Sequence, residues 1–183
     1  LPVQSGSNKI LKAMNRKHTI EEYLKVYESL KEINPNVEFS SDFIIGYPGE
    51  DEDDFNKTME LIEKIGFINS YSFIFSARPG TVAADLTQVN AVKSKERLEI
   101  IQKKLFENQI KKNKSLENKI LNVLVENIMK DGIKLFGRTE YMTSVIFDGD
   151  IDNIGKIVQV EITSSNQNSL FGKLVESSKK KVA

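Results

Sequence analysis

Three short segments combine glycine or serine with a side chain that could bind a ligand. They are Gln4-Ser5-Gly6-Ser7, Gly46-Tyr47-Pro48-Gly49-Glu50 and Ala77-Arg78-Pro79-Gly80-Thr81. Glycine lets a backbone approach a bound molecule closely. Taken singly, each segment is typical of an ordinary turn. Their recurrence after successive predicted strands indicates one shared ligand site, because ligands of βα proteins bind at the carboxyl ends of the strands.

Asp42 is the most informative acidic residue. It stands directly before Phe43-Ile44-Ile45, a run that predicts a buried strand, where an unpaired carboxylate would cost several kcal/mol. Asp42 is either a structural or water-exposed carboxylate, or it accepts hydrogen bonds from the hydroxyls of a ligand such as a ribose. Glu50 is a weaker candidate than Asp42, because it begins an acidic run that could simply cap a helix.

Helices and strands alternate in the first half of the chain and must position these residues. Ser7 predicts the start of a short helix, Thr19 to Glu22 has the spacing of a capping box, and Asp51 or a neighbour caps a third helix that ends at Gly66. On one face of the second helix, a stripe of large aromatic and aliphatic side chains is expected, formed by Tyr23, Tyr27, Leu30 and Ile33. Strands are predicted over residues 37–45 and 71–75.

This order of elements predicts an α/β fold with a parallel sheet, as in part of a barrel. Two or three βα units are too few to close a barrel. The chain begins with Leu1 and has neither a signal-peptide pattern nor a Met at its start. We therefore expect it to be a fragment of a longer protein.

The second half predicts a different kind of module. A long basic helix is expected from Ser94 to about Leu116, and the hydrophobic period then changes from 3.6 to 2 residues. Asp131-Gly132 predicts a hairpin turn. Five short strands are expected near residues 121–125, 135–139, 145–147, 158–162 and 170–175. Five strands within about 60 residues are typical of a small all-β barrel.

Composition excludes several classes of site and protein. With 39% hydrophobic and 28% charged residues, the chain is typical of a globular protein. It has no cysteine, so disulfides and cysteine-ligated iron–sulfur clusters are impossible within it, and His18 cannot form a metal site alone. We expect His18 to be exposed before a helix. No apolar run approaches the roughly 18 residues that span a bilayer, and we expect no membrane association and a cytoplasmic location.

Charge is spread unevenly, although the formal net charge is zero. Residues 1–90 carry 9 basic and 14 acidic side chains, residues 91–117 carry 8 and 4, and residues 118–183 carry 9 and 8. A basic linking segment therefore joins an acidic body to a near-neutral module.

Several of these motifs together resemble a known family. The chain contains Leu1-Pro2-Val3-Gln4-Ser5-Gly6-Ser7, Met14-Asn15-Arg16, Asp42 to Glu50, and Arg78-Pro79-Gly80-Thr81. In this order they resemble the radical S-adenosylmethionine (SAM) methylthiotransferases. Phe136-Gly137-Arg138-Thr139-Glu140, Gly155 to Ile162 and Leu170-Phe171-Gly172 resemble the TRAM module that ends those enzymes. The residues of the first two motifs are most similar to those of the family branch that modifies tRNA.

The resemblance implies a fold and a reaction. Residues 1–116 would be the C-terminal part of a radical-SAM partial barrel with its basic linking helix, residues 117–178 a TRAM domain, and residues 179–183 a basic tail. The family adds a sulfur atom and a methyl group to a modified adenosine beside the anticodon, using SAM and two 4Fe-4S clusters. For the branch that this chain resembles most, the implied product carries the methylthio group on C2 of N6-isopentenyladenosine. The cysteines that hold both clusters precede the motifs present here, so the resemblance implies that this chain is inert by itself. The sulfur donor stays unknown.

The resemblance also implies residue roles. Gln4 and Asp42 would contact the ribose of SAM, with Ser5 beside Gln4, and the fork of Arg16 would pair with its carboxylate. Gly46 and Gly49 would let the backbone pass close to the adenine.

The implied partner is the anticodon stem-loop of tRNA. Small barrels of this type bind nucleic acid through a positive face and exposed aromatic rings. The residues that we expect to contact RNA are Lys134, Arg138, Tyr141 and Lys173 in the module, and Arg78, which could instead face SAM.

Two other functions remain open at this stage. Within the family, the substrate could be threonylcarbamoyl-adenosine in tRNA. Outside it, the chain could belong to a non-catalytic RNA-binding protein with a degenerate barrel and a TRAM module. A Cys-x3-Cys-x2-Cys run before Leu1 would distinguish the enzyme from the binding protein.

Overall fold

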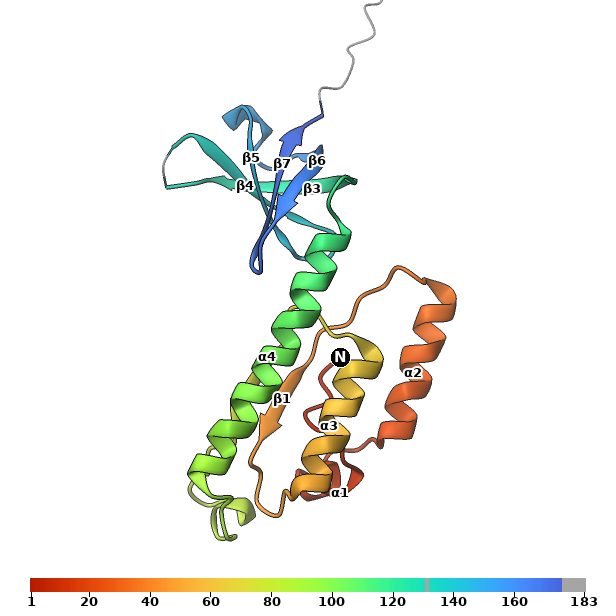
Figure 1. Ribbon diagram of the computed structural model, residues 1–183, viewed down its shortest axis with the longest axis vertical. Coiled ribbons are helices and arrows are strands. Elements are labelled where there is room, and N and C mark those ends of the chain that lie inside the picture. Colours follow the sequence, from red (N-terminus) through yellow and green to blue (C-terminus); the bar gives the residue numbers. More distant parts are fainter. Residues whose placement is uncertain (131, 176–183) are drawn as a thin grey trace, which may run out of the picture. The chain divides into compact units, whose positions relative to one another are not determined.

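The computed structural model describes residues 1–130 and 132–175 (Figure 1). Its residues group into two compact units, Leu1–Asn108 and a second unit that begins at Gln109.

The first unit consists of helices around a short parallel sheet. Strand β1 (Asp42–Ile45) pairs in parallel with β2 (Tyr71–Ile74), and Gln4 forms an isolated parallel bridge with Phe43 on the other side of β1. The helices are α1 (Asn8–Ala13), α2 (Ile20–Ile33), α3 (Glu52–Ile65), the short 3-10 helix η1 (Val82–Ala84) and most of α4 (Ala91–Ser115). The predicted α/β class with a parallel sheet is confirmed.

Helix ends follow the local signals in the sequence. Thr19 and Glu22 form a reciprocal capping box at the start of α2, and Asp51 and Asp54 form another at the start of α3. Gly66 ends α3 in the left-handed conformation, with φ of 71°. Each of these caps is confirmed, because it depends only on residues that are neighbours in the chain.

The core of the first unit lies between the sheet and its helices. Phe43 and Ile45 of β1 are fully buried and pack with Phe55 and Ile62 of α3, which runs alongside β1 in Figure 1. Alternate residues of β1 point to the opposite face of the sheet, where Asp42 is exposed.

Three expectations for this unit are wrong. The strand predicted over residues 37–45 begins only at Asp42, because the segment before it makes single bonds to the region of Ile68 and Ser70 and no ladder. The predicted stripe of α2 reaches the core only at Tyr23 and Tyr27; Leu30 and Ile33 are 38% and 81% exposed. His18 is half-buried and lies 6.2 Å from the ring of Tyr23 instead of standing in solvent.

The second unit contains a closed barrel, which confirms the predicted small all-β module. Its strands follow the order β3-β4-β5-β7-β6. They are β3 (Ile120–Ile128), β4 (Lys134–Thr139), β5 (Ser144–Asp148), β6 (Ile157–Ser165) and β7 (Ser169–Leu174), with the 3-10 helix η2 (Ile151–Asn153) before β6. All pairs are antiparallel except β5 with β7.

Alternation of inward and outward side chains along the strands explains this barrel, although the register shifts once between β3 and β4 and once between β6 and β7. Val123, Val125, Leu135, Val145 and Phe147 are among the side chains that fill its interior, and all are at most 1% exposed. Their neighbours along each strand point outwards. Asp131 of the predicted hairpin and the predicted basic tail, residues 179–183, lie outside the described residues, as do residues 176–178.

Among the described residues, no helix is both long and apolar enough to cross a bilayer.

Candidate cofactor and nucleic-acid sites

A depression of about 590 Å³ lies beside the carboxyl ends of β1 and β2. It brings together Arg16, which follows α1, and Arg78, which follows β2. Ile44 lines the depression from the face of the sheet opposite the core. The other lining residues are Met14, Tyr47, Phe73, Ile74, Phe75, Ser76, Thr81 and Ala83. An apolar hollow with two cations at its rim is suited to a ligand that has both a flat apolar part and a negative charge.

Tyr47 fixes the geometry of this depression. Its hydroxyl donates to the carbonyl oxygen of Ala13 at 2.9 Å, and its ring lies 4.8 Å from that of Phe75. The turn after β1 is thereby tied both to the end of α1 and to the end of β2. Asn15, in the left-handed region with φ of 56°, reverses the chain so that Arg16 leaves α1 at this point.

Gln4 is held next to β1 by two backbone hydrogen bonds, to the carbonyl oxygen of Asp42 and from the N–H of Ile44. Its side chain is 94% buried, and its Oε1 has no hydrogen-bond partner within the described part of the chain. Buried polar atoms are normally satisfied. An orphaned acceptor of this kind fits a ligand that donates a hydrogen bond. Gln4 does not itself line the depression.

Ser5 and Asp42 are not among the residues that line the depression. The Oγ of Ser5 lies 3.4 Å from the Oγ1 of Thr58 and accepts from the N–H of Ser7, so this hydroxyl connects the first segment to α3. Asp42 begins β1, is exposed, and does not line the depression. Its carboxylate therefore avoids the cost of burial.

Gly46 and Gly49 both have positive φ angles, of 73° and 85°. A Cβ added to Gly46 would lie 2.4 Å from the Oγ of Ser94, whereas nothing lies within 4 Å of one added to Gly49. Gly46 thus permits close packing of the turn on α4. Gly49 is required only for the backbone geometry of the turn.

Glu50 and Arg97 form a buried ion pair that the sequence did not reveal. Arg97 Nη1 lies 2.8 Å from Glu50 Oε1, and both side chains are at most 3% exposed. Glu50 also accepts from the N–H of Gly46, and Arg97 Nη2 reaches Glu52 at 3.0 Å. Burial raises the pKa of the Glu50 carboxyl, while the Gly46 N–H and Arg97 oppose that rise.

One signal could have pointed to Arg97. It precedes Ile101 and Leu105 by four and eight residues, so it occupies the apolar face of α4. A basic residue on such a face needs a buried acidic partner. The sequence does not say which of the acidic residues between Glu50 and Asp54 supplies it.

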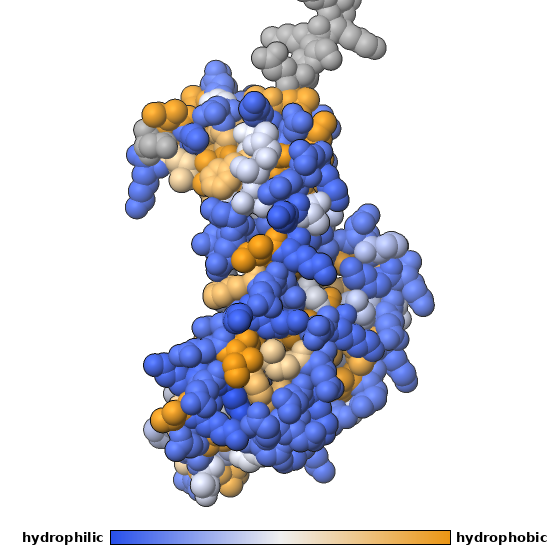
Figure 2. Space-filling model, viewed as in Figure 1, coloured by the Kyte–Doolittle hydropathy of each residue, from blue (hydrophilic) through white to orange (hydrophobic). Residues whose placement is uncertain are grey.

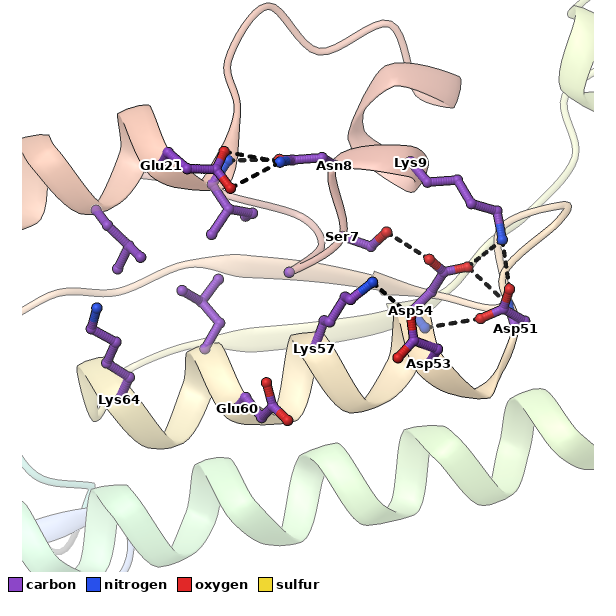
Figure 3. A pocket seen from close by; sticks show the side chains of 14 residues that line it. Ser7, Asn8, Lys9, Glu21, Asp51, Asp53, Asp54, Lys57, Glu60 and Lys64 are labelled. Atoms are coloured by element: carbon purple, nitrogen blue, oxygen red, sulfur yellow. Dashed lines mark hydrogen bonds and ion pairs between the residues drawn. The ribbon is translucent and has the colours of Figure 1, made fainter.

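A second depression, of about 520 Å³, lies between α1, α2 and α3 (Figure 3). In the close-up, Ser7 and Lys9 converge on Asp54, and Lys9 also reaches Asp51. Burial acts to raise the pKa of Asp54, but hydrogen bonds from Lys9, Ser7 and the Asp51 N–H outweigh it and lower that pKa. These charges are paired with one another, which gives them a structural role in joining α1 to α3.

In the β-barrel, the predicted RNA contacts lie on the outer face. Strand register places Asp148 directly between Lys134 and Lys173, so these two lysines flank a carboxylate. Arg138 Nε lies 3.2 Å from Glu126 Oε2, and its guanidinium lies 5.7 Å from the ring centre of Phe136.

Tyr141 and Arg78 complete the set of predicted RNA contacts. Lys112 Nζ lies 4.2 Å above the ring of Tyr141. Arg78 belongs to the first unit and lines the depression beside Arg16.

Each of the two units contains a segment that matches a known protein family. Residues 1–62 match the family model of the Radical SAM superfamily, and residues 114–175 match that of the TRAM domain. The whole chain is 84% identical over 183 residues to the tRNA-2-methylthio-N(6)-dimethylallyladenosine synthase of Pelagibacter ubique (strain HTCC1062). Over its whole length, the chain is similar to a radical SAM methylthiotransferase.

Other relatives with the same name are more distant. Proteins with the same name from Ruthia magnifica subsp. Calyptogena magnifica and Anaplasma phagocytophilum (strain HZ) are 48% and 47% identical, over 96% and 94% of this chain. The chain spans about 40% of the length of these curated relatives.

Proposed function

We propose that this chain is part of an enzyme that adds a methylthio group to C2 of N6-isopentenyladenosine, beside the anticodon of tRNA, by SAM radical chemistry. The observation that carries the proposal is the 84% identity, over the whole chain, with a relative named for this product. The same identity covers both the radical SAM part and the TRAM part.

Residues of the first unit would bind SAM. Arg16 at the rim of the depression would hold the carboxylate of SAM through its planar fork, and Ile44 with Phe73 offers an apolar surface for the adenine. The orphaned Oε1 of Gln4 could accept a hydrogen bond from a ribose hydroxyl. In this proposal Asp42 contributes from the exposed start of β1, Ser5 positions Gln4, and Gly46 and Gly49 shape the turn.

Iron–sulfur clusters accompany SAM in the radical SAM superfamily. This chain has no cysteine to hold one. We propose that the full-length protein binds two 4Fe-4S clusters through residues outside this chain, where they would supply the radical and the sulfur chemistry. By itself, the chain would not catalyse the reaction.

The TRAM domain would bind the tRNA substrate, through its anticodon stem-loop. The contacts we propose are Arg138, Tyr141, Lys134 and Lys173, while Arg78 is better placed to face SAM or the reacting base. A cytoplasmic location, where tRNA is found, is part of the same proposal.

Deletion of the full-length gene tests the function. Nucleosides of total tRNA from the deletion strain, measured by mass spectrometry, should lack the methylthio group and accumulate N6-isopentenyladenosine, and the full-length gene should restore the modification. Loss of methylthio-threonylcarbamoyl-adenosine instead would assign the other branch of the family. Unchanged methylthio nucleosides would contradict an enzymatic role.

A second experiment tests the cofactor residues. In the full-length protein, Arg16→Ala should weaken SAM binding by about tenfold or more, because a charge-assisted contact is lost, and Arg16→Lys should restore only part of it. Asp42→Ala should also weaken binding. Equal SAM affinity in calorimetric titrations of wild type and Asp42→Ala would remove Asp42 from the site.

A further inference from the structure

An aromatic row crosses the outside of the β-barrel on three neighbouring strands. Strand register pairs Phe136 of β4 with Ile146 of β5, and Ile146 with Phe171 of β7. All three are partly exposed, and none belongs to the core cluster of the barrel. Figure 2 shows apolar side chains exposed among hydrophilic ones on the visible face of this unit.

The barrel interior does not need these three side chains. Leu135, Val145 and Leu170 stand immediately before them on the same strands, point inwards and are fully buried. Because side chains alternate along a strand, Phe136, Ile146 and Phe171 must point away from the core. Three large apolar residues in register on an outer face form a continuous apolar surface.

Basic side chains border this row on both sides. Arg138 lies two residues along β4, with its guanidinium 5.7 Å from the ring centre of Phe136. On the other side, register places Lys134 and Lys173 next to the row with Asp148 between them. The border is therefore mixed in charge, with three cations against Asp148 and the Glu126 that pairs with Arg138.

We propose that Phe136 and Phe171 form a platform on which unpaired RNA bases stack, with Ile146 as apolar contact between them. The proposal rests on the proposed function, because it assigns the surface through which the TRAM domain binds RNA. Aromatic rings on a sheet surface are the usual means of holding single-stranded bases, and each stacked base contributes substantially to affinity.

The geometry favours single-stranded RNA over a duplex. The two rings stand on strands that are two positions apart, a separation of about 10 Å, so each ring can take its own base. A base inside a duplex has both faces covered by its neighbours and cannot stack on a protein ring. Arg138 beside Phe136 is placed to contact a phosphate or to stack on the same base.

Tryptophan fluorescence gives a direct test, because the chain contains no tryptophan. Phe136→Trp and Phe171→Trp each introduce one fluorophore on the platform, and Ile157→Trp introduces a matched one at an exposed site of β6 outside the row. Titration with an eight-nucleotide unpaired oligoribonucleotide should quench the two platform fluorophores strongly. Ile157→Trp should respond little.

Affinity measurements provide the second test. In fluorescence anisotropy with the same oligonucleotide, Phe136→Leu and Phe171→Leu should each raise Kd by about 5- to 100-fold, since leucine keeps apolar volume and loses the ring face. The slope of log K against log salt should not change, because no phosphate contact is removed. Lys134→Ala should reduce that slope. Circular dichroism confirms that each variant is folded.

The outcomes separate the platform from the function on which it rests. If wild type binds the oligonucleotide but the leucine variants bind equally well, or the platform fluorophores are not quenched, the platform is wrong and RNA binding by the TRAM domain stands. If wild type binds neither the oligonucleotide nor an anticodon stem-loop, both fail. Preference of wild type for duplex RNA over the unpaired oligonucleotide would also overturn the platform.

Discussion

At the scale of single residues, the buried pair of Glu50 and Arg97 has the largest expected effect on stability. Arg97 connects α4 to the turn after β1 and to the start of α3, through Glu50 and Glu52. Two buried charges are tolerated only when they pair with each other. Removing one of them leaves the other buried and uncompensated.

Arg97→Ala should therefore destabilise the first unit by about 3–5 kcal/mol, measured by urea unfolding. Lys93→Ala is the matched control, because Lys93 pairs with the same Glu52 but is 49% exposed. An exposed pair of this kind contributes at most about 1 kcal/mol. Equal unfolding free energies for the two variants would show that Arg97 is not the residue that holds the turn.

At the scale of elements, the turn between β1 and α3 contains two glycines, and each is required for a different reason. Gly46→Ala brings a Cβ against Ser94 and adds strain at positive φ, whereas Gly49→Ala adds the strain alone. Strain at positive φ costs about 1 kcal/mol. We expect Gly49→Ala to lose about that much stability in urea unfolding and Gly46→Ala to lose clearly more.

A second substitution checks this explanation. Ser94→Ala removes the Oγ that the new Cβ would meet, so Gly46→Ala in that background should lose less stability than in wild type. Strict additivity of the two substitutions would mean that contact with α4 does not explain why residue 46 is glycine.

The start of α3 makes the first unit sensitive to acid. The pKa of Asp54 is lowered in the folded protein, because hydrogen bonds from Lys9, Ser7 and Asp51 together exceed the opposing effect of its burial. A carboxyl with a lowered folded pKa contributes stability above its unfolded pKa, about 3.9, and loses it as the pH falls through the folded value.

Asp54→Asn should thus cost about 1–3 kcal/mol at pH 7, and the difference from wild type should shrink below about pH 4. Urea unfolding at several pH values measures this. Asp53→Asn, at a side chain that is 75% exposed in an i,i+4 pair with Lys57, should change stability little at any pH. A difference for Asp54→Asn that is constant down to pH 2 would refute the role of its ionised form.

The helices and strands also differ in how well the sequence predicts them. The caps at Thr19, Asp51 and Gly66 were predictable, because their signals lie within a few residues. The five strands of the barrel were predictable as well, because a period of two residues alternates buried and exposed positions whatever the strand's partner.

Features that depend on residues far apart in the sequence were not predictable. The pairing of Glu50 with Arg97 spans 47 residues. Residues 37–41 have the composition of a strand, but they make only single hydrogen bonds to the segment before β2 and no ladder. Arg16 and Arg78 line the same depression, where Tyr47 contacts both Ala13 at the end of α1 and Phe75 after β2.

At the scale of the whole molecule, the proposed SAM site and the proposed RNA site lie in different units. The first unit holds the depression with Arg16 and Arg78, and the second holds the barrel with its aromatic row. This arrangement predicts that RNA affinity and SAM affinity can be lost separately.

Removal of residues 118–183 from the full-length protein should therefore weaken binding of the tRNA substrate and leave SAM affinity unchanged. Each lysine or arginine contact to a phosphate that is lost should reduce the slope of log K against log salt by about 0.7, the value for single strands. The described part of the module is nearly balanced in charge, so we expect only a small change of slope. The larger part of the loss of tRNA affinity should persist at high salt, because base stacking does not depend on charge. Filter binding of tRNA at several salt concentrations, with calorimetry of SAM in parallel, measures both. Unchanged tRNA affinity at every salt concentration would remove substrate binding from the TRAM domain.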